Sequence, residues 1–410
     1  MNILWISAYV PYDSVPHAGG KNHNFYLKQI FEKNRNLDLL SFYSSNEKSK
    51  IDLDAYGIKN HLICRTPNPR TKFERIKYRF LVHLFQLNPF THCLYYKNSA
   101  DLRQAYHKIK SSSFFEQNKL DVIILQWTEM VLLLPKLKKL FPFAKFVAIE
   151  EDVFFLASFR RWFYSTNIFK KILSFFEFKR IKRLERKCLE MADLVILNNY
   201  KDYKLLDDNG VICNKIVNTP FYMNMSHIKC KHSGKDILFY GAMCRSENYL
   251  SAIWFIENVF PKLEPLGYRF IILGNKPHES LKKFDNGKSI CVTGFVDNIT
   301  PYFENCLCLV APLVLGAGIK IKILEAMSSG LPVLTNEIGI EGINAVDEQD
   351  YFFCKTPDDY EKRILSLSEN PDIGINMDSM AKKFVKEQFN YERDAELFFT
   401  RLQKLAGSKS

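Results

Sequence analysis

The residues best suited to chemistry lie in one stretch, Cys308–Thr335, which holds glycines, two lysines and a glutamate at close spacing. The apolar run Cys308–Leu315 predicts a buried strand, and Gly316, Ala317 and Gly318 form a tight turn after it. Apolar positions then recur at helical spacing over Ile319–Ser329. A helix that starts after such a turn presents free backbone N–H groups, which attract an anion.

The side chains of this helix suit a nucleoside diphosphate. Lys320 and Lys322 lie in its first turns, where two cations beside the positive end of the helix favour a diphosphate. Glu325 follows one turn later, and its carboxylate can accept hydrogen bonds from ribose hydroxyls. A structural interpretation stays open: glycine turns connect strands and helices in any open α/β sheet, the lysines can be solvated, and Glu325 can pair with Lys322.

The elements that must position this stretch alternate between strands and helices. Each of three expected strands upstream ends in a glycine: Asp236–Tyr240 at Gly241, Phe270–Leu273 at Gly274 and Ile290–Thr293 at Gly294. Because the carboxyl ends of parallel strands share one edge of a sheet, the loops after them converge there. The C-terminal half therefore predicts a parallel sheet with a ligand-binding edge.

The N-terminal half follows the same rhythm. A strand at Asn2–Val10 leads into a polar loop, Pro11–Lys21, which holds Gly19 and Gly20, and a helix is expected over Asn22–Lys33. Further buried-type strands are expected downstream, at Leu120–Gln126, Lys145–Ile149 and Asp193–Asn198. At 410 residues the chain suits two domains. We therefore predict the α/β class, with two doubly wound domains that face a central cleft.

Composition narrows the class further. The ten cysteines are scattered, without a zinc-ligand spacing, so we expect reduced thiols and no metal or other cofactor. The first residues read as a strand and not a signal peptide, and no stretch reaches the roughly 18 apolar residues that span a bilayer. We expect a cytoplasmic protein. The formal charge is +12, but the sequence contains no nucleic-acid recognition module. Nucleic acid is therefore not an expected partner.

The most basic part of the chain is Phe159–Cys188, where ten Lys or Arg alternate with aromatic residues. A basic helix with an aromatic side is typical of segments on an anionic membrane surface. A second stretch, Lys72–Phe85, alternates similarly. We expect a peripheral contact with the inner face of the cell membrane through Arg160, Arg161, Lys179, Arg180, Lys182 and Arg183. The alternative is a crossover helix with a buried aromatic side and solvated cations.

These motifs together resemble family 4 glycosyltransferases of the GT-B fold, in a bacterial polysaccharide-type branch. The branch motif has a strand, a G-[ST]-G-x-[RK]-x-K-[IL]-L-E-A segment and then G-x-P-V, which this chain matches at Gly316, Gly318, Lys320, Lys322, Leu324, Glu325, Ala326, Gly330, Pro332 and Val333. The likeness is strongest over residues 236–345. It extends to the N-terminal glycine loop and to the segment that ends in DLVILNN.

The resemblance implies a hexosyltransferase-like enzyme with two Rossmann-like domains. It implies transfer of a sugar, with retained anomeric configuration, from a nucleotide-diphosphate sugar to a hydroxyl acceptor, without a metal. The two basic-aromatic stretches add the expectation that this acceptor is a saccharide that is lipid-linked or part of a growing surface polysaccharide. Glu325 would hold the ribose, and Arg245 and Lys322 would face the phosphates; these three are the catalytic candidates. The other donor-side positions are Gly19, Gly20, Gly241, Gly274, Val296, Asp297, Asn298, Gly316, Ala317, Gly318, Ile319 and Lys320, and the acceptor-side positions are Glu151 and Asp152.

The chain departs from the family at two donor-side positions. Ala317 stands where many members have a sugar-binding glutamate, and the lysine that often follows Arg245 is missing, so Lys320 or Lys322 would replace it. Two alternatives follow: a non-catalytic nucleotide-sugar-binding scaffold of a polysaccharide system, or a GT-B nucleotide-sugar epimerase. The expected domains are an acceptor-side domain at 1–225, a donor domain at 236–388 and a helix at 389–410 that packs back on the first domain.

Overall fold

The computed structural model describes residues 1–65, 73, 76, 96–111, 119–163, 168–316 and 318–407. The chain divides into two compact units. The N-terminal unit contains Met1–Thr219 together with Tyr391–Ser410, and the second unit contains Pro220–Asn390. Each unit is described by itself below.

The N-terminal unit is built on a seven-stranded parallel sheet of order β3-β2-β1-β4-β5-β6-β7. The central strands are apolar on both faces, as expected for strands covered by helices on both sides. The strands are β1 (Ile3–Ser7), β2 (Leu37–Tyr43), β3 (Lys59–Cys64), β4 (Val122–Gln126), β5 (Lys145–Glu150), β6 (Leu194–Leu197) and β7 (Lys215–Val217).

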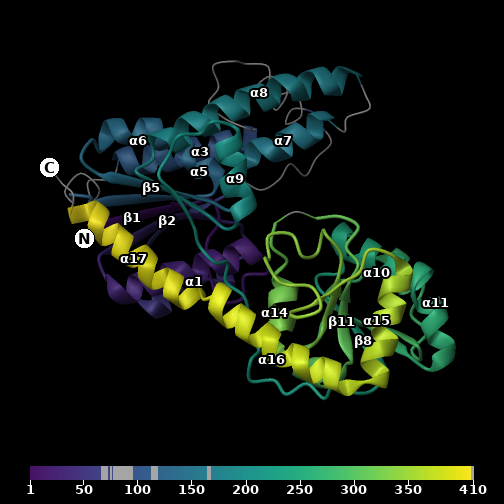
Figure 1. The fold of residues 1–410 in the computed structure, drawn as a ribbon. Coiled ribbons are helices and arrows are strands. Elements are labelled where there is room, and N and C mark those ends of the chain that lie inside the picture. The colour runs from purple at the N-terminus through teal and green to yellow at the C-terminus, as the bar shows by residue number, and fades with distance from the viewer. Residues whose placement is uncertain are drawn as a thin grey trace. The chain divides into compact units, whose positions relative to one another are not determined.

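Helices cover both faces of this sheet (Figure 1), and a hydrophobic core lies on each face. One core receives side chains from the helices that follow β3, β4 and β5, and the other from the first and last helices of the chain. Trp5 of β1 is fully buried and packs edge-on against Phe398 of the last helix, with the ring centroids 6.2 Å apart. The helices are α1 (Ala18–Lys33), α3 (Tyr96–Ser111), α5 (Thr128–Val131), α6 (Leu134–Leu140), α7 (Phe154–Phe163), α8 (Ile168–Met191), α9 (Tyr200–Asp208) and α17 (Tyr391–Gly407), with short 3₁₀ turns η1 (Lys48–Lys50) and η2 (Leu53–Tyr56).

The second unit is built on a six-stranded parallel sheet of order β10-β9-β8-β11-β12-β13, again with helices on both faces (Figure 1). Its strands are β8 (Asp236–Tyr240), β9 (Arg269–Leu273), β10 (Ile290–Gly294), β11 (Cys308–Ala311), β12 (Val333–Thr335) and β13 (Phe352–Phe353). Its helices are α10 (Ser246–Asn258), α11 (Phe260–Leu263), α12 (Glu279–Lys282), α13 (Thr300–Asn305), α14 (Ile321–Ser329), α15 (Pro357–Glu369) and α16 (Pro371–Gln388), with the 3₁₀ turn η3 (Glu264–Leu266). The predicted α/β class with two doubly wound, Rossmann-like domains is confirmed.

Two expected boundaries in the donor stretch were wrong. The strand expected over Cys308–Leu315 ends at Ala311, and the helix expected from Ile319 begins at Ile321. An apolar run does not tell a strand from the loop that continues it, because both bury the same side chains. The loop between β11 and α14, at the carboxyl edge of the sheet, is therefore longer than expected.

The expected polar loop Pro11–Lys21 is also shorter than predicted. Helix α1 begins at Ala18, so Gly19 and Gly20 lie in its first turn. A Cβ on Gly20 would lie 2.5 Å from the Val15 side chain, and one on Gly19 would lie 3.3 Å from the Glu151 carboxylate. These glycines therefore permit close packing of the helix start.

The helix expected at 389–410 is α17, which begins at Tyr391 and is separate from the helix before it. Helix α16 ends at Gln388 and α17 begins at Tyr391, with a non-helical backbone at Phe389 between them. No glycine or proline marks this break in the sequence. In the part of the chain that the structure describes, no helix is long and apolar enough to cross a bilayer.

Candidate functional site

The carboxyl edge of the second unit's sheet brings several glycine turns together. The Gly241 N–H donates to the Leu273 carbonyl and the Gly274 N–H to the Gly294 carbonyl, each at 3.0 Å. A Cβ on Gly274 would lie 1.6 Å from the Gly241 carbonyl oxygen, so only glycine allows the turns after β8 and β9 to lie this close. The structure thus places Gly241, Gly274 and Gly294 at one edge.

The turn before α14 is held by Lys320. Its ammonium donates to the Gly318 carbonyl at 2.5 Å and lies 3.8 Å from the Glu341 carboxylate. A Cβ on Gly316 would lie 2.9 Å from Cε of Lys320, so the lysine stem passes directly beneath the turn. Ile319 is partly buried beside it, and Ala317 lies outside the described residues. Lys320 therefore shapes the turn that leads into α14.

Lys322 lies in the first turn of α14 and bonds to a neutral partner. Its ammonium donates to Oδ1 of Asn248 at 2.6 Å and lies 4.7 Å from the centre of the Phe239 ring. Burial lowers the pKa of Lys322 to about 7. Among the charges around it, Glu247 and Glu325 raise this pKa, whereas Lys320 and Arg245 lower it. In its protonated form Lys322 carries a charge that no salt bridge among the described residues neutralises, which suits an anionic ligand.

Glu325 is buried one turn further along α14, with 4% of its surface exposed. Its carboxylate accepts the Met223 N–H at 3.2 Å and the Tyr240 hydroxyl. Burial and this carboxylate raise the pKa of Tyr240. Glu325 thus joins α14 to the end of β8 and to the chain segment that enters the unit at residue 220.

The remaining donor-side candidates surround this edge. Arg245 precedes α10, is exposed and forms a salt bridge with Glu247 at 2.6 Å. The loop after β10 holds Val296, Asp297 and Asn298, of which the last two are exposed, and the Asn298 side chain accepts the Thr300 N–H at 3.0 Å. Arg245 can therefore turn toward a ligand at little cost, because its present partner is a surface residue.

Glu151 forms a second polar centre, in the N-terminal unit at the carboxyl ends of β4, β5 and β6. Its two carboxylate oxygens accept hydrogen bonds from Gln126 and Asn198, each at 2.6 Å, and a longer one from Asn22 at 3.5 Å. Burial nevertheless raises the pKa of Glu151 to about 7. Asp152 beside it is exposed. Glu151 is thus a fixed carboxyl group that changes charge near neutral pH.

The first turn of α1 lies against this centre. The Gly20 N–H already donates to Nδ1 of His17 at 2.9 Å, and the Lys21 N–H donates to the His17 carbonyl. Gly19 lies next to the Glu151 carboxylate, as its close approach shows. The expected anion site at Gly19 and Gly20 is therefore a helix start whose Gly20 and Lys21 N–H groups are occupied and which faces a carboxyl group.

The basic-aromatic stretch forms two helices that pack together, α7 and α8. Trp162 stacks on Phe178 with the ring centroids 5.9 Å apart, and Phe159 packs edge-on against the same ring. Part of the aromatic side thus packs between the helices, as the structural alternative expected, whereas Phe163 and Phe176 are exposed. Glu185 of α8 accepts the N–H groups of Phe154 and Phe155 at the start of α7.

One face of α8 remains exposed, and we call it the exposed α8 face. Its apolar members, Ile168, Ile172 and Phe176, are 50–66% exposed, and Lys179 and Arg183 continue the same helical stripe. Arg160, Arg180 and Lys182 are partly buried, and Lys182 donates to Asn209. The Arg161 side chain and most of Lys72–Phe85 lie outside the described residues.

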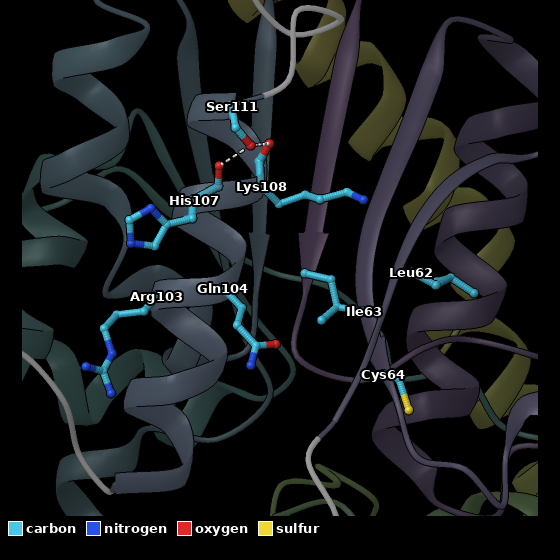
Figure 2. A pocket seen from close by; sticks show the side chains of 8 residues that line it. All are labelled: Leu62, Ile63, Cys64, Arg103, Gln104, His107, Lys108 and Ser111. Carbon is cyan, nitrogen blue, oxygen red and sulfur yellow. Dashed lines mark hydrogen bonds between the residues drawn. The ribbon is translucent and has the colours of Figure 1, made fainter.

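A cavity of about 720 Å³ that the sequence did not indicate lies between β3 and α3 (Figure 2). Gln104 and Lys108 extend from α3 toward β3, whereas Arg103 and His107 extend from the other side of the helix. None of the eight lining residues is acidic. The cavity has no pair of groups for acid–base chemistry, so the two sheet edges remain the candidate sites.

The sequence did not predict the uncharged side chains that bond Lys322 and Glu151 at the edges of the two sheets. Asn248, Gln126 and Asn198 are ordinary amides whose sequence neighbours give no signal, and they lie 74, 25 and 47 residues from the charged groups they bond. Only the position at the end of a strand, which Gln126 and Asn198 share, could have indicated them. No group of His, Cys, Asp or Glu that could hold a metal ion occurs among the described residues.

Comparison with known proteins identifies what this arrangement is similar to. Residues 234–370 match the family model described as "Glycosyl transferases group 1". A Klebsiella pneumoniae protein described as an uncharacterized 44.6 kDa protein in the cps region is 25% identical over 262 residues, which is 60% of this chain. The match spans 64% of that relative, less than two thirds of its length.

Solved structures match nearly the whole chain. Sucrose-phosphate synthase from Thermosynechococcus elongatus has 13% identity and a TM-score of 0.66, with all of both chains covered. HepE from Anabaena in complex with UDP has 12% identity and a TM-score of 0.64, covering 98% of this chain and 100% of its own. HepE also has a structure in complex with UDP-glucose. At this identity the likeness shows the fold, so the chain has the GT-B fold, and the model match over its second unit supports a glycosyltransferase.

Proposed function

We propose that this protein transfers a sugar from a nucleoside-diphosphate sugar to a hydroxyl acceptor, with retention of the anomeric configuration. The observation that carries the proposal is that the family match and the candidate residues lie in the same part of the chain. The family-model match, 234–370, contains the whole sheet edge at which Arg245, Lys322 and Glu325 lie. HepE, a structural neighbour, binds UDP and UDP-glucose, which supports a donor of this class.

The main chemical task at this edge is to stabilise the departing diphosphate. Negative charge develops on the leaving phosphate in the transition state, and fixed positive groups stabilise it. Lys322 supplies a cation held in place, and Arg245 supplies an exposed one that can close on the ligand. In this proposal Glu325 binds the ribose, the turns at Gly241, Gly274 and 316–318 contact the diphosphate and sugar, and Val296–Asn298 contact the base.

The proposed acceptor is a saccharide, either linked to lipid or part of a growing surface polysaccharide. The Klebsiella relative is named for a cps region, which supports a polysaccharide role. Glu151 is the proposed acceptor-side group, because a carboxyl with a pKa near neutral can accept a hydroxyl proton. Gly19 would support Glu151 in this role through its close approach, and Gly20 would let the start of α1 pack against Val15 and His17. No metal or other cofactor is required by the proposal.

A membrane-linked acceptor would bring the protein to a lipid surface, and we propose the inner face of the cell membrane. The exposed α8 face supports this part of the proposal. Its apolar residues can enter the boundary between headgroups and acyl chains while Lys179 and Arg183 meet lipid phosphates. The contact would be peripheral.

The test is a thermal-shift screen of the purified chain against UDP-, GDP-, ADP- and dTDP-sugars, followed by a transfer assay with the donor that binds. A ligand that binds only the folded state raises the unfolding midpoint. At 100 times its Kd it adds about 2.7 kcal/mol to the free energy of unfolding. We expect one nucleotide class to act and sugar transfer to follow. Binding without transfer or hydrolysis would indicate the scaffold alternative, and a response to none would contradict the proposed donor.

A further inference from the structure

We infer that Asn248 is a positioning residue: its side-chain amide holds the Lys322 ammonium at the place where the donor diphosphate binds. The inference rests on the proposed function, which places a diphosphate at this edge. Asn248 is 94% buried, lies in the first turn of α10 and touches Lys322 through one short hydrogen bond. Its Oδ1 accepts from that ammonium at 2.6 Å.

The orientation of the Asn248 amide is fixed by its second bond. Its Nδ2 donates to the Ala242 carbonyl at 2.9 Å, so Oδ1 must face Lys322. Gly241 gives the amide its room, because a Cβ there would lie 2.9 Å from Nδ2. The turn after β8 thus aims the Asn248 oxygen, and Asn248 in turn aims the Lys322 ammonium.

A neutral acceptor suits this purpose better than a carboxylate. An amide oxygen fixes the position of a cation but leaves its charge for the ligand, whereas a carboxylate would neutralise it in advance. The Phe239 ring, 4.7 Å away, supports the ammonium from the sheet side without cancelling its charge. The free site therefore holds a positioned amine whose charged form has no carboxylate bonded to it within the described part of the chain.

The charged groups that face this ammonium come from three elements. Arg245 and Glu247 belong to the start of α10, Lys320 to the turn before α14, and Glu325 to α14 itself. Together with burial they leave Lys322 with a pKa of about 7. An incoming diphosphate favours the charged amine, so binding above neutral pH takes up a proton at Lys322.

The experiment uses inorganic pyrophosphate, the part common to all nucleoside-diphosphate donors, and the full chain. Its affinity is measured by titration calorimetry from pH 6 to 9 for the wild type, Asn248→Ala and Asn248→Asp. The matched controls are Asn258→Ala and Asn258→Asp, because Asn258 is an exposed residue of the same helix that bonds only the Trp254 carbonyl. The titration of pyrophosphate itself is common to all variants and cancels in the ratios.

We expect Asn248→Ala to weaken binding about tenfold at pH 6.5, since it removes a hydrogen bond to a charged group. Asn248→Asp places a carboxylate at the ammonium, so it should weaken binding at pH 6.5 yet make the affinity less dependent on pH above 7. The Asn258 variants should match the wild type in both respects. Thermal unfolding of each variant at each pH identifies a general loss of folding, which is separate from a change in the profile of the folded protein.

The outcomes separate the two claims. If the wild type binds pyrophosphate and the Asn248 variants bind it equally well with the same pH profile, the positioning role is wrong and the proposed donor site stands. If neither pyrophosphate nor any nucleoside-diphosphate sugar binds the wild type, the proposed donor site is wrong and the inference falls with it. Weaker binding by Asn248→Ala with a flattened profile for Asn248→Asp supports the inference.

Discussion

The carboxylate of Glu325 accepts the backbone N–H of Met223, 102 residues away in the chain, at 3.2 Å. The donor-side glutamate is therefore part of the packing that fixes the entry segment of the second unit onto α14. A neighbouring bond, from the Met225 N–H to the Ser328 hydroxyl at 3.0 Å, fixes the same segment. Glu325 has a structural task in the free protein beside its proposed role with ribose.

Glu325→Ala should therefore lose both stability and donor binding. The Met223 N–H and the partly buried Tyr240 hydroxyl would lose their acceptor, at a cost of about 1–3 kcal/mol in the free energy of unfolding. Ser328→Ala is the control, because it loosens the same segment without a ribose-facing group. Chemical denaturation and donor affinity are measured for both. If Ser328→Ala weakens donor binding as much as Glu325→Ala, the ribose role is wrong.

Replacing Lys322 should have opposite effects on the stability of the folded chain and on diphosphate binding. Its pKa of about 7 in the folded chain lies below the ordinary lysine value near 10.4, so the unfolded chain binds more protons between these pH values. Stability should then rise with pH from about 7 to 10. Lys322→Met should remove this pH dependence, raise the unfolding midpoint at pH 7 by a few degrees and abolish diphosphate binding. Thermal unfolding at pH 7 and 9.5 checks it; an unchanged slope would contradict the buried-cation assignment.

The titration of Glu151 should change stability with pH in the opposite direction to that of Lys322. Its pKa is raised to about 7, so the folded chain holds a proton that the unfolded chain releases near pH 4.5. The stability that this proton gives is present below pH 4.5 and lost as pH rises through 7. Glu151→Gln should make the free energy of unfolding fall less between pH 5 and 8 and should slow sugar transfer. Glu32→Gln, exposed on α1, is the control. Equal slopes in all three proteins would show that Glu151 does not titrate in this range.

The exposed α8 face predicts binding to anionic vesicles. Lys179→Ala with Arg183→Ala should weaken binding to phosphatidylglycerol-containing vesicles roughly 30-fold, at about 1 kcal/mol for each cation near the surface. Lys362→Ala with Lys383→Ala removes the same charge from exposed positions of the second unit and should have little effect. Co-sedimentation measures both. Equal binding by the two double variants, or none by the wild type, would refute this surface.

Much of the fold could be predicted because its signals are local. Apolar runs and the glycines that end them place β8, β9 and β10 to within a residue or two. The start of α1 could not be predicted because it depends on the His17 side chain that caps it and on Glu151. Glu151 lies 132 residues from Gly19. The packing of Trp162 on Phe178 between α7 and α8 is likewise a tertiary effect that composition alone does not decide.

The candidate site divides in the same way. Lys322 and Glu325 stand out in the sequence because they follow a glycine turn at fixed spacing. Asn248, which bonds Lys322, stands out only once the start of α10 meets the start of α14 in the fold, since its own helix start looks ordinary. Charged groups are visible in a sequence, whereas the neutral groups that orient them become visible through contacts.

Helix α17 gives the chain an unusual order of completion. It supplies Ala395, Phe398 and Leu402 to the core built on β1 and α1, although nearly the whole second unit lies between them in the sequence. During synthesis the second unit has all its residues once position 390 has emerged, while the first unit still lacks part of its core. The unit that is made first can therefore finish folding only last, and a chain truncated before α17 would leave Trp5 and its neighbours without their cover.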